Sequence, residues 1–181
     1  MRLTLFAGIL FLSLFLVACG GGKEEPEVVL YDTDLRSYGV PFKIKTPSET
    51  PDMKKDEFLG ELVGLSILDK NYYVQIMVNQ APMKDLASLK AEALGDVKKL
   101  TDEQFLNIVQ EDENGFIYEK KFENDTIKYY DFRFVKTQGE KLYTMSTTTT
   151  RKPPHITEPL GKEKVFMIYK SIGGDPKEPK K

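Results

Sequence analysis

The sequence predicts an α+β domain, in which an antiparallel β-sheet of about six to seven strands has two amphipathic helices packed on it, an α/β/α sandwich. Short stretches of alternating apolar and polar residues recur along the chain, separated by turn sequences, which is typical of strands. Two other stretches place apolar residues three or four positions apart, which indicates helices. The length of 181 residues fits one domain.

Three strands are predicted in the first half of the chain, at residues 39–46, 61–68 and 72–80. In the first, GVPFKIKT, apolar and basic side chains alternate, so one face should be buried. Prolines in residues 47–53 end this strand. Asp69-Lys70-Asn71 is a predicted hairpin turn between the other two. Strands joined by short turns pair antiparallel.

Residues 85–100 change to helical spacing. The apolar stripe consists of Leu86, Leu89, Ala93, Val97 and Leu100. Asp85 can cap the start of the helix, and lysines near its end suit the helix dipole. This stripe should cover one face of the sheet.

Strands return in the second half. They are predicted at residues 105–112, 115–122, 126–137 and 141–149, with turns at Asn114-Gly115 and Gln138-Gly139. A closing helix is predicted over residues 157–172, with Thr157 as N-cap, Pro159 in the first turn and Gly173 at the end. The domain is therefore expected to span residues 30–173, followed by a polar, disordered tail at residues 174–181.

The N-terminus is a candidate targeting segment. Residues 3–18 are apolar apart from Thr4 and Ser13, and Arg2 precedes them. A membrane-spanning helix needs about 20 apolar residues, and this run is shorter. It ends in small residues, as a secretory signal peptide does.

The run ends in Leu16-Val17-Ala18-Cys19, which resembles the lipobox of bacterial lipoproteins. The resemblance implies that the Cys19 thiol receives a diacylglycerol, that cleavage falls between Ala18 and Cys19, and that the new amino group is acylated. Each buried methylene adds about 0.8 kcal/mol, so two or three acyl chains anchor a protein firmly. Residues 1–18 would then be a signal peptide and residues 19–29 a flexible tether, which holds the chain to a membrane.

Lys23-Glu24-Glu25 in the tether resembles the signal that sends some lipoproteins of the Bacteroidetes group to the cell surface. The expected location is the cell envelope, with the outer membrane favoured. Exposure at the cell surface and a periplasm-facing domain both remain open.

The rest of the chain resembles the PsbP-like fold and the DcrB-type envelope lipoproteins. The resemblance lies in YGVPFKIKTP near the start, SLKAEALGDVKKL in the middle, a tyrosine-rich hairpin, and KVFMIYKSI at the end, and covers roughly residues 30–172. It implies a docking or accessory role for an envelope protein partner, without enzymatic activity. A small-ligand or lipid-binding module, with a pocket between sheet and helix, is the alternative.

The composition excludes several classes of site. One Cys and one His exclude a disulfide within the chain and a structural zinc site of Cys and His ligands. A net charge of −2 does not suit a nucleic-acid partner. His155 lies in the proline-flanked RKPPHITEP with no nucleophile motif nearby, and is interpreted as a loop residue. We expect no cofactor and no metal.

Acidic and aromatic clusters are the remaining candidates. The acidic clusters are Asp32 and Asp34, then Glu111, Asp112 and Glu113, then Glu123 and Asp125. Such clusters can bind calcium or act in acid/base chemistry, but acidic turns are commonly just solvated. The aromatic run of Tyr129, Tyr130, Phe132 and Phe134 is interpreted as sheet core rather than a ligand pocket. Partly exposed tyrosines suited to a partner surface are expected at Tyr72, Tyr73 and Tyr118.

Overall fold

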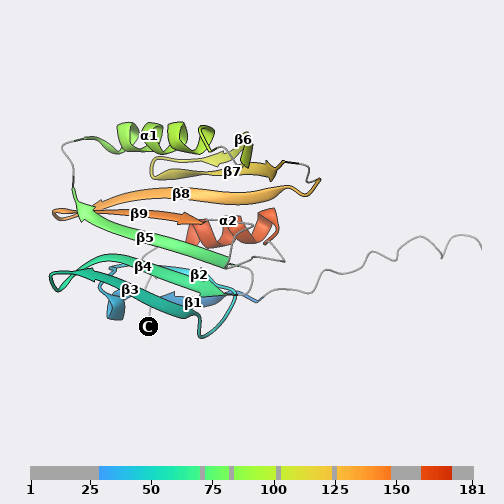
Figure 1. Ribbon diagram of the computed structural model, residues 1–181. Helices are drawn as coiled ribbons and strands as arrows, with labels where there is room; N and C mark the ends of the chain where they lie inside the picture. Colours follow the sequence, from blue (N-terminus) through green and yellow to red (C-terminus); the bar gives the residue numbers. More distant parts are fainter. Residues whose placement is uncertain are drawn as a thin grey trace, which may run out of the picture.

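The computed structural model describes residues 29–69, 72–81, 84–100, 103–123, 126–147 and 160–172. In these ranges it confirms an α+β fold, with a seven-stranded antiparallel sheet, a separate two-stranded sheet and two helices (Figure 1). The first half contains β1 (Tyr31–Asp34), a 3₁₀ turn (Arg36–Tyr38), β2 (Lys43–Thr46), β3 (Asp52–Phe58), β4 (Glu61–Asp69) and β5 (Tyr72–Gln80). The second half contains α1 (Leu86–Lys98), β6 (Glu103–Glu111), β7 (Gly115–Phe122), β8 (Tyr129–Gln138), β9 (Lys141–Thr147) and α2 (Lys162–Ser171).

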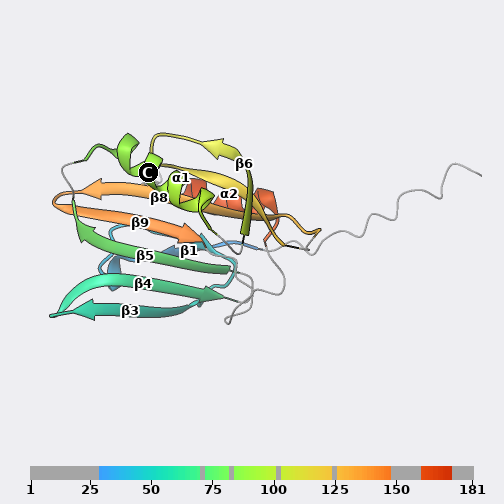
Figure 2. The same ribbon diagram turned by 45° about the horizontal axis from the view of Figure 1, so that its top comes forward.

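The large sheet has the strand order β3-β4-β5-β9-β8-β7-β6, and every pair is antiparallel. The chain leaves β5 through α1, enters the sheet again at the opposite edge as β6, and returns by hairpins until β9 pairs with β5 (Figure 2). The two halves of the sequence therefore meet in the middle of the sheet.

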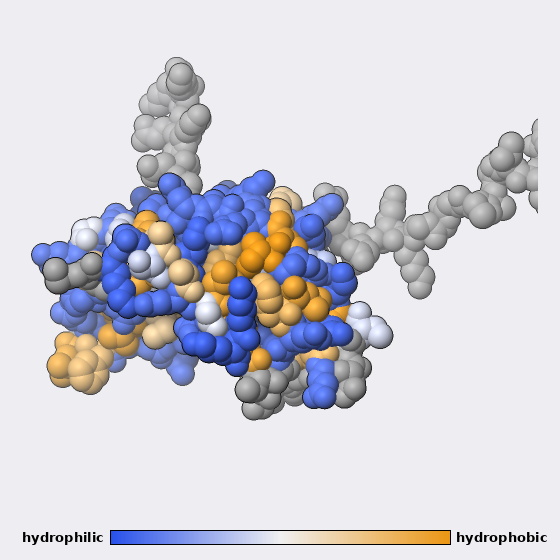
Figure 3. All heavy atoms as spheres, turned by 90° about the horizontal axis from the view of Figure 1, so that it is seen from above, coloured by the Kyte–Doolittle hydropathy of each residue, from blue (hydrophilic) through white to orange (hydrophobic). Residues whose placement is uncertain are grey.

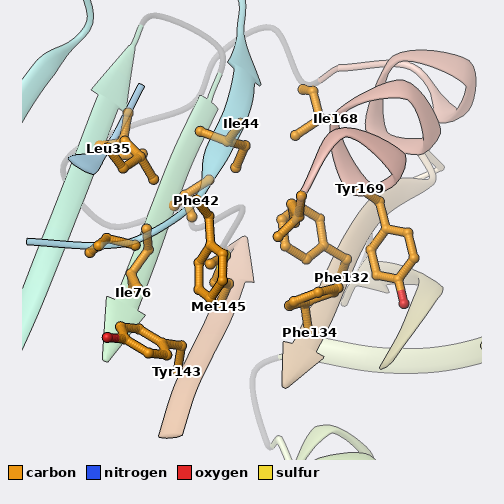
Figure 4. Close-up of a cluster of buried hydrophobic side chains, with 14 of the residues drawn as sticks. Leu35, Phe42, Ile44, Ile76, Phe132, Phe134, Tyr143, Met145, Ile168 and Tyr169 are labelled. Carbon is orange, nitrogen blue, oxygen red and sulfur yellow. The ribbon is translucent and has the colours of Figure 1, made fainter. Parts of the chain in front are cut away.

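The main core lies on the face of the large sheet that α2 and the β1–β2 sheet cover. Phe42, from the segment leading into β2, meets Tyr143 of β9 edge to face, with ring centroids 5.0 Å apart. Tyr169 of α2 meets Phe132 and Phe134 of β8 in the same way, at 5.6 and 5.8 Å. Figure 4 shows these side chains pointing toward one another. Burial of each such side chain contributes about 1.5–3 kcal/mol.

The opposite face of the sheet is covered only in part. α1 lies against β8 and β6, and a small cluster forms there from Val97, Phe116 and Tyr118. Because side chains alternate along a strand, Phe116 and Tyr118 of β7 face α1, whereas Ile117 between them belongs to the main core. The helices thus lie on opposite faces of the sheet, and the β1–β2 sheet completes the layer of α2.

Two predicted boundaries are wrong. The strand predicted over residues 39–46 is shorter, because the chain first makes the 3₁₀ turn, closed by Gly39 at φ +87°, and β2 begins at Lys43. α2 begins at Lys162 after Gly161, which has an extended backbone, rather than at a Thr157 cap. Thr157, Pro159 and Gly173 lie outside the described residues.

β1 and β3 were not predicted from the sequence. In β3, DMKKDEF, almost every side chain is charged and exposed, so no apolar alternation marks the strand. Its place is secured by backbone pairing with β4 and by Met53, which packs against the main core. The helix at α1 is confirmed, since the carboxylate of its N-cap, Asp85, accepts a 2.7 Å hydrogen bond from the Ser88 amide.

Candidate functional site

The residues predicted to carry lipidation and export lie outside the part of the chain that the structure describes. These are Ala18, Cys19, Lys23, Glu24 and Glu25. His155 lies outside it as well. Their roles stay predictions from the sequence, and the described residues show what the domain itself offers.

The first acidic cluster is divided between two ion pairs. Asp34 accepts hydrogen bonds from the Arg36 guanidinium, with its Nη2 2.5 Å from Oδ2, and from the Arg36 backbone amide at 3.0 Å. These bonds lower the pKa of Asp34 to about 2. Asp32 pairs instead with Lys45 of β2, at 3.0 Å. Both carboxylates thus have cationic partners, one in the 3₁₀ turn and one in β2.

The second cluster connects the β6–β7 turn to both helices. Asp112 accepts hydrogen bonds from the backbone amides of Asn114 and Gly115 and from the Tyr169 hydroxyl of α2, at 2.8 Å. Burial, together with this hydrogen bond to Asp112, raises the pKa of Tyr169. On the other side, Glu111 pairs with Lys90 of α1 at 2.8 Å. The arrangement favours a structural role.

The structure describes only one of the two residues of the third acidic cluster. Glu123 is exposed at the end of β7, and Asp125 lies outside the described ranges. Within the residues that the structure places, no group of three or more His, Cys, Asp or Glu side chains is arranged to hold a metal ion.

Sequence reasoning missed a buried ionic cluster that joins β6, β7 and β8. Lys120 of β7 and Asp131 of β8 are each only 1% exposed at the side chain, and the Lys120 Nζ lies 2.6 Å from Asp131 Oδ2. The same ammonium lies 2.8 Å from Glu103 of β6 and 5.3 Å from the centroid of the Phe122 ring. One cation therefore connects three neighbouring strands.

A signal for this cluster is present in GFIYEKKF. Lys120 shares the face of Phe116, Tyr118 and Phe122 by its even spacing, so an inward-facing lysine could have been inferred once that face was known to be buried. Nothing nearby in the sequence reveals its partners, because Glu103 and Asp131 come from different strands. Since the cluster is enclosed, we interpret it as fixing the strand register rather than as a reactive site.

Glu119 makes a second network on the other face of β7. It accepts hydrogen bonds from Lys128 at 2.8 Å and from the Asn107 side chain at 2.7 Å. The bond from Lys128 is the main cause that lowers the pKa of Glu119. These contacts join β6, β7 and the segment before β8.

The aromatic residues are divided between core and surface. Phe132 and Phe134 belong to the main core, in agreement with the sheet-core interpretation. Tyr118 was predicted to be partly exposed, and this is wrong: it is 1% exposed, because α1 and β6 cover it. Tyr73 is half-buried, with its hydroxyl 3.4 Å from Ser66 Oγ. The Tyr72 side chain lies outside the described residues.

Comparison with known proteins assigns no relative, since no family model and no curated protein matches the chain. Among the described helices, none has the length and apolar character needed to cross a membrane.

Proposed function

We propose that the chain is a lipid-anchored lipoprotein of a bacterial cell envelope, and that its folded domain docks to an envelope protein partner without enzymatic activity. The observation that carries the proposal is Leu16-Val17-Ala18-Cys19 at the end of an apolar run. The charged and glycine-rich residues that follow suit a solvated tether between membrane and domain.

The contacts in the domain support a docking role. Asp34, Asp112 and Asp131 are each held by hydrogen bonds or ion pairs within the fold. Such engaged carboxylates stabilise a scaffold rather than serve a substrate. We rank a small-ligand pocket between sheet and helix second, because ring contacts from Tyr169 join α2 directly to the sheet.

The anchor is tested by substituting Cys19→Ala in the full chain. We expect wild-type protein to incorporate an alkyne-labelled fatty acid and to fractionate with membranes. The variant should lose the label and accumulate as the unprocessed precursor. A Cys19→Ala chain that is processed and labelled like the wild type would contradict the lipoprotein assignment.

The orientation and the partner need two further measurements. Protease treatment of intact cells should digest the domain if Lys23-Glu24-Glu25 directs it to the surface, and leave it intact if it faces the periplasm. Crosslinking with a general lysine-reactive reagent in these cells, followed by purification of the tagged chain, should give one reproducible envelope protein. No reproducible crosslinked protein at native expression levels would contradict the docking role.

A further inference from the structure

The turn between β3 and β4 exposes two large apolar side chains. Phe58 is 67% exposed and Leu59 is 89% exposed. Phe58 pairs with Glu61, so Leu59 and Gly60 are the two central residues of the hairpin turn. Both have positive φ, +53° for Leu59 and +81° for Gly60, as a two-residue type I′ turn requires. We call Phe58, Leu59 and Gly60 the apolar tip.

Leucine is an unfavourable choice at this position for two independent reasons. Its side chain stands in water, and an L-residue with a Cβ is disfavoured in the left-handed region, where glycine or asparagine is normal. The fold gains little in exchange: a Cβ built on Gly60 would meet no atom within 4 Å, so the tip projects clear of the domain. A strained residue at an exposed position points to a functional contact.

Acidic side chains surround the apolar tip. Asp56 and Glu57 precede it, Glu61 follows it, and all three are exposed. Of the basic residues earlier in the chain, Lys55 has its ammonium 5.7 Å from the centroid of the Tyr38 ring, and Arg36 is paired with Asp34. Lys54 lies further along β3. The immediate border of the tip is therefore negative.

The tip lies at the end of the domain away from the start of the described chain. Tyr31 of β1 pairs with Thr46, at the end of β2 from which the chain continues to β3. β3 then runs the length of the sheet to the turn, as Figure 1 shows. In the space-filling view, an apolar group protrudes at the same end of the molecule (Figure 3).

We propose that the apolar tip inserts Phe58 and Leu59 into an apolar pocket of a protein partner, and that Lys or Arg residues at the rim of the pocket meet Asp56, Glu57 and Glu61. This inference rests on the proposed docking function and names its contact surface. A membrane is a poor alternative occupant, because anionic lipid repels an acidic border and the tip lies away from the tethered end. A protein pocket with a basic rim satisfies both the apolar and the charged groups.

The test places a photocrosslinking amino acid, p-benzoylphenylalanine, at Phe58 of the full chain in the cells that produce it. A control chain carries it at Met167 of α2, which is 52% exposed and lies on another element. We expect a protein adduct from position 58 only. Its crosslinked peptide should contain apolar residues next to Lys or Arg.

Three further variants carry the probe at position 58. Leu59→Asn should lower the adduct yield roughly tenfold or more, because burial of one leucine is worth about that factor in affinity. Glu57→Lys should lower it too, by weakening the charged rim. Met167→Gln removes apolar exposure elsewhere and should leave the yield unchanged. The thermal midpoint of Leu59→Asn should equal or exceed that of the wild type, which shows that lost contact does not reflect misfolding.

Several outcomes would overturn the inference. They are an adduct to phospholipid, equal protein adducts from positions 58 and 167, and an unchanged yield in Leu59→Asn. The crosslinking experiment with the lysine-reactive reagent then shows whether only the proposed contact surface is wrong or the docking function as well. If lysine-reactive reagent captures a partner while position 58 gives no adduct, the domain docks by another surface. If neither gives a partner, the docking function itself is wrong.

Discussion

At the scale of single residues, Lys120 has the strictest requirement for partners, because its charged ammonium is buried in the interior. Removing one partner of a buried ion pair leaves the other charge uncompensated, at a cost of about 3–5 kcal/mol. Lys120→Met removes the ammonium that pairs with Asp131 and Glu103. We expect the free energy of unfolding, measured by urea denaturation, to fall by about that amount.

The control for this prediction is Lys45→Met. Lys45 pairs with Asp32, whose side chain is 73% exposed, and exposed pairs contribute about 0–1 kcal/mol. A Lys120→Met chain that loses no more stability than Lys45→Met would show that the enclosed cluster does not stabilise the fold.

Asp34 provides a prediction of pH dependence. The hydrogen bonds from Arg36 lower its pKa from 3.8 to about 2 in the folded chain. A carboxylate whose pKa is lowered by folding stabilises the fold above its unfolded pKa, and this contribution is lost as the pH falls from about 4 through 2. Titration of the Asp34 side-chain carbon by NMR should therefore show a midpoint near 2. In Arg36→Gln the midpoint should return toward 3.8, and a wild-type midpoint already near 3.8 would contradict the pairing.

At the scale of elements, two glycines show opposite requirements. A Cβ on Gly115 would lie 2.0 Å from the Arg133 carbonyl oxygen of β8, whereas one on Gly95 of α1 would meet nothing within 4 Å. Gly115→Ala should therefore push β7 from β8 and destabilise the chain by about 1–3 kcal/mol. Gly95→Ala should stabilise it by about 0.5–1 kcal/mol, because alanine loses less backbone entropy in a helix. Thermal denaturation of both variants checks the prediction, and equal effects would contradict it.

Gly115 also shows which part of the fold could be predicted from the sequence and which part could not. Asn114-Gly115 was predicted as a turn, and the β6–β7 turn does lie there. The glycine itself, however, begins β7, where the close backbone of β8 leaves no room for a side chain. The close contact comes from Arg133 of β8, and it depends on how β8 aligns with β7. The local sequence around Gly115 does not reveal that alignment. The α1 helix and the strands with apolar alternation were predictable, because the spacing of apolar residues that indicates them lies within the element itself.

The two edge strands of the large sheet explain why β3 was missed. An exposed edge can pair with other chains, and charged side chains or bulges prevent this. β3 carries the charges, which remove the apolar alternation by which a strand is recognised. At the other edge, β6 has register irregularities between Phe105 and Asn107 and between Ile108 and Gln110. The charges that protect the β3 edge are thus what obscured it in the sequence, whereas β6 keeps enough apolar residues to be predicted despite its irregularities.

At the scale of the whole molecule, the two faces of the sheet differ in how much they bury. On the α2 side, buried residues from β2, α2 and the large sheet form one continuous cluster. On the other side, Val97 is the one residue of α1 that is buried, and the exposed face of β5 carries Gln75, Met77 and Asn79. A region with few buried contacts opens locally at lower free energy than the core. α1 should therefore open before the sheet unfolds.

Hydrogen exchange on two core variants tests this order. Phe42→Ala removes the ring that joins the β2 layer to Tyr143, and should lower the global free energy of unfolding by about 3–5 kcal/mol. Amides of β5 and β9 should then exchange faster. Val97→Ala loosens only the small cluster under α1, so amides of α1 should exchange faster while those of β5 and β9 keep their wild-type rates. If Val97→Ala accelerated the central strands as much as Phe42→Ala does, the two faces would unfold as one unit, and α1 would be as integral to the fold as α2.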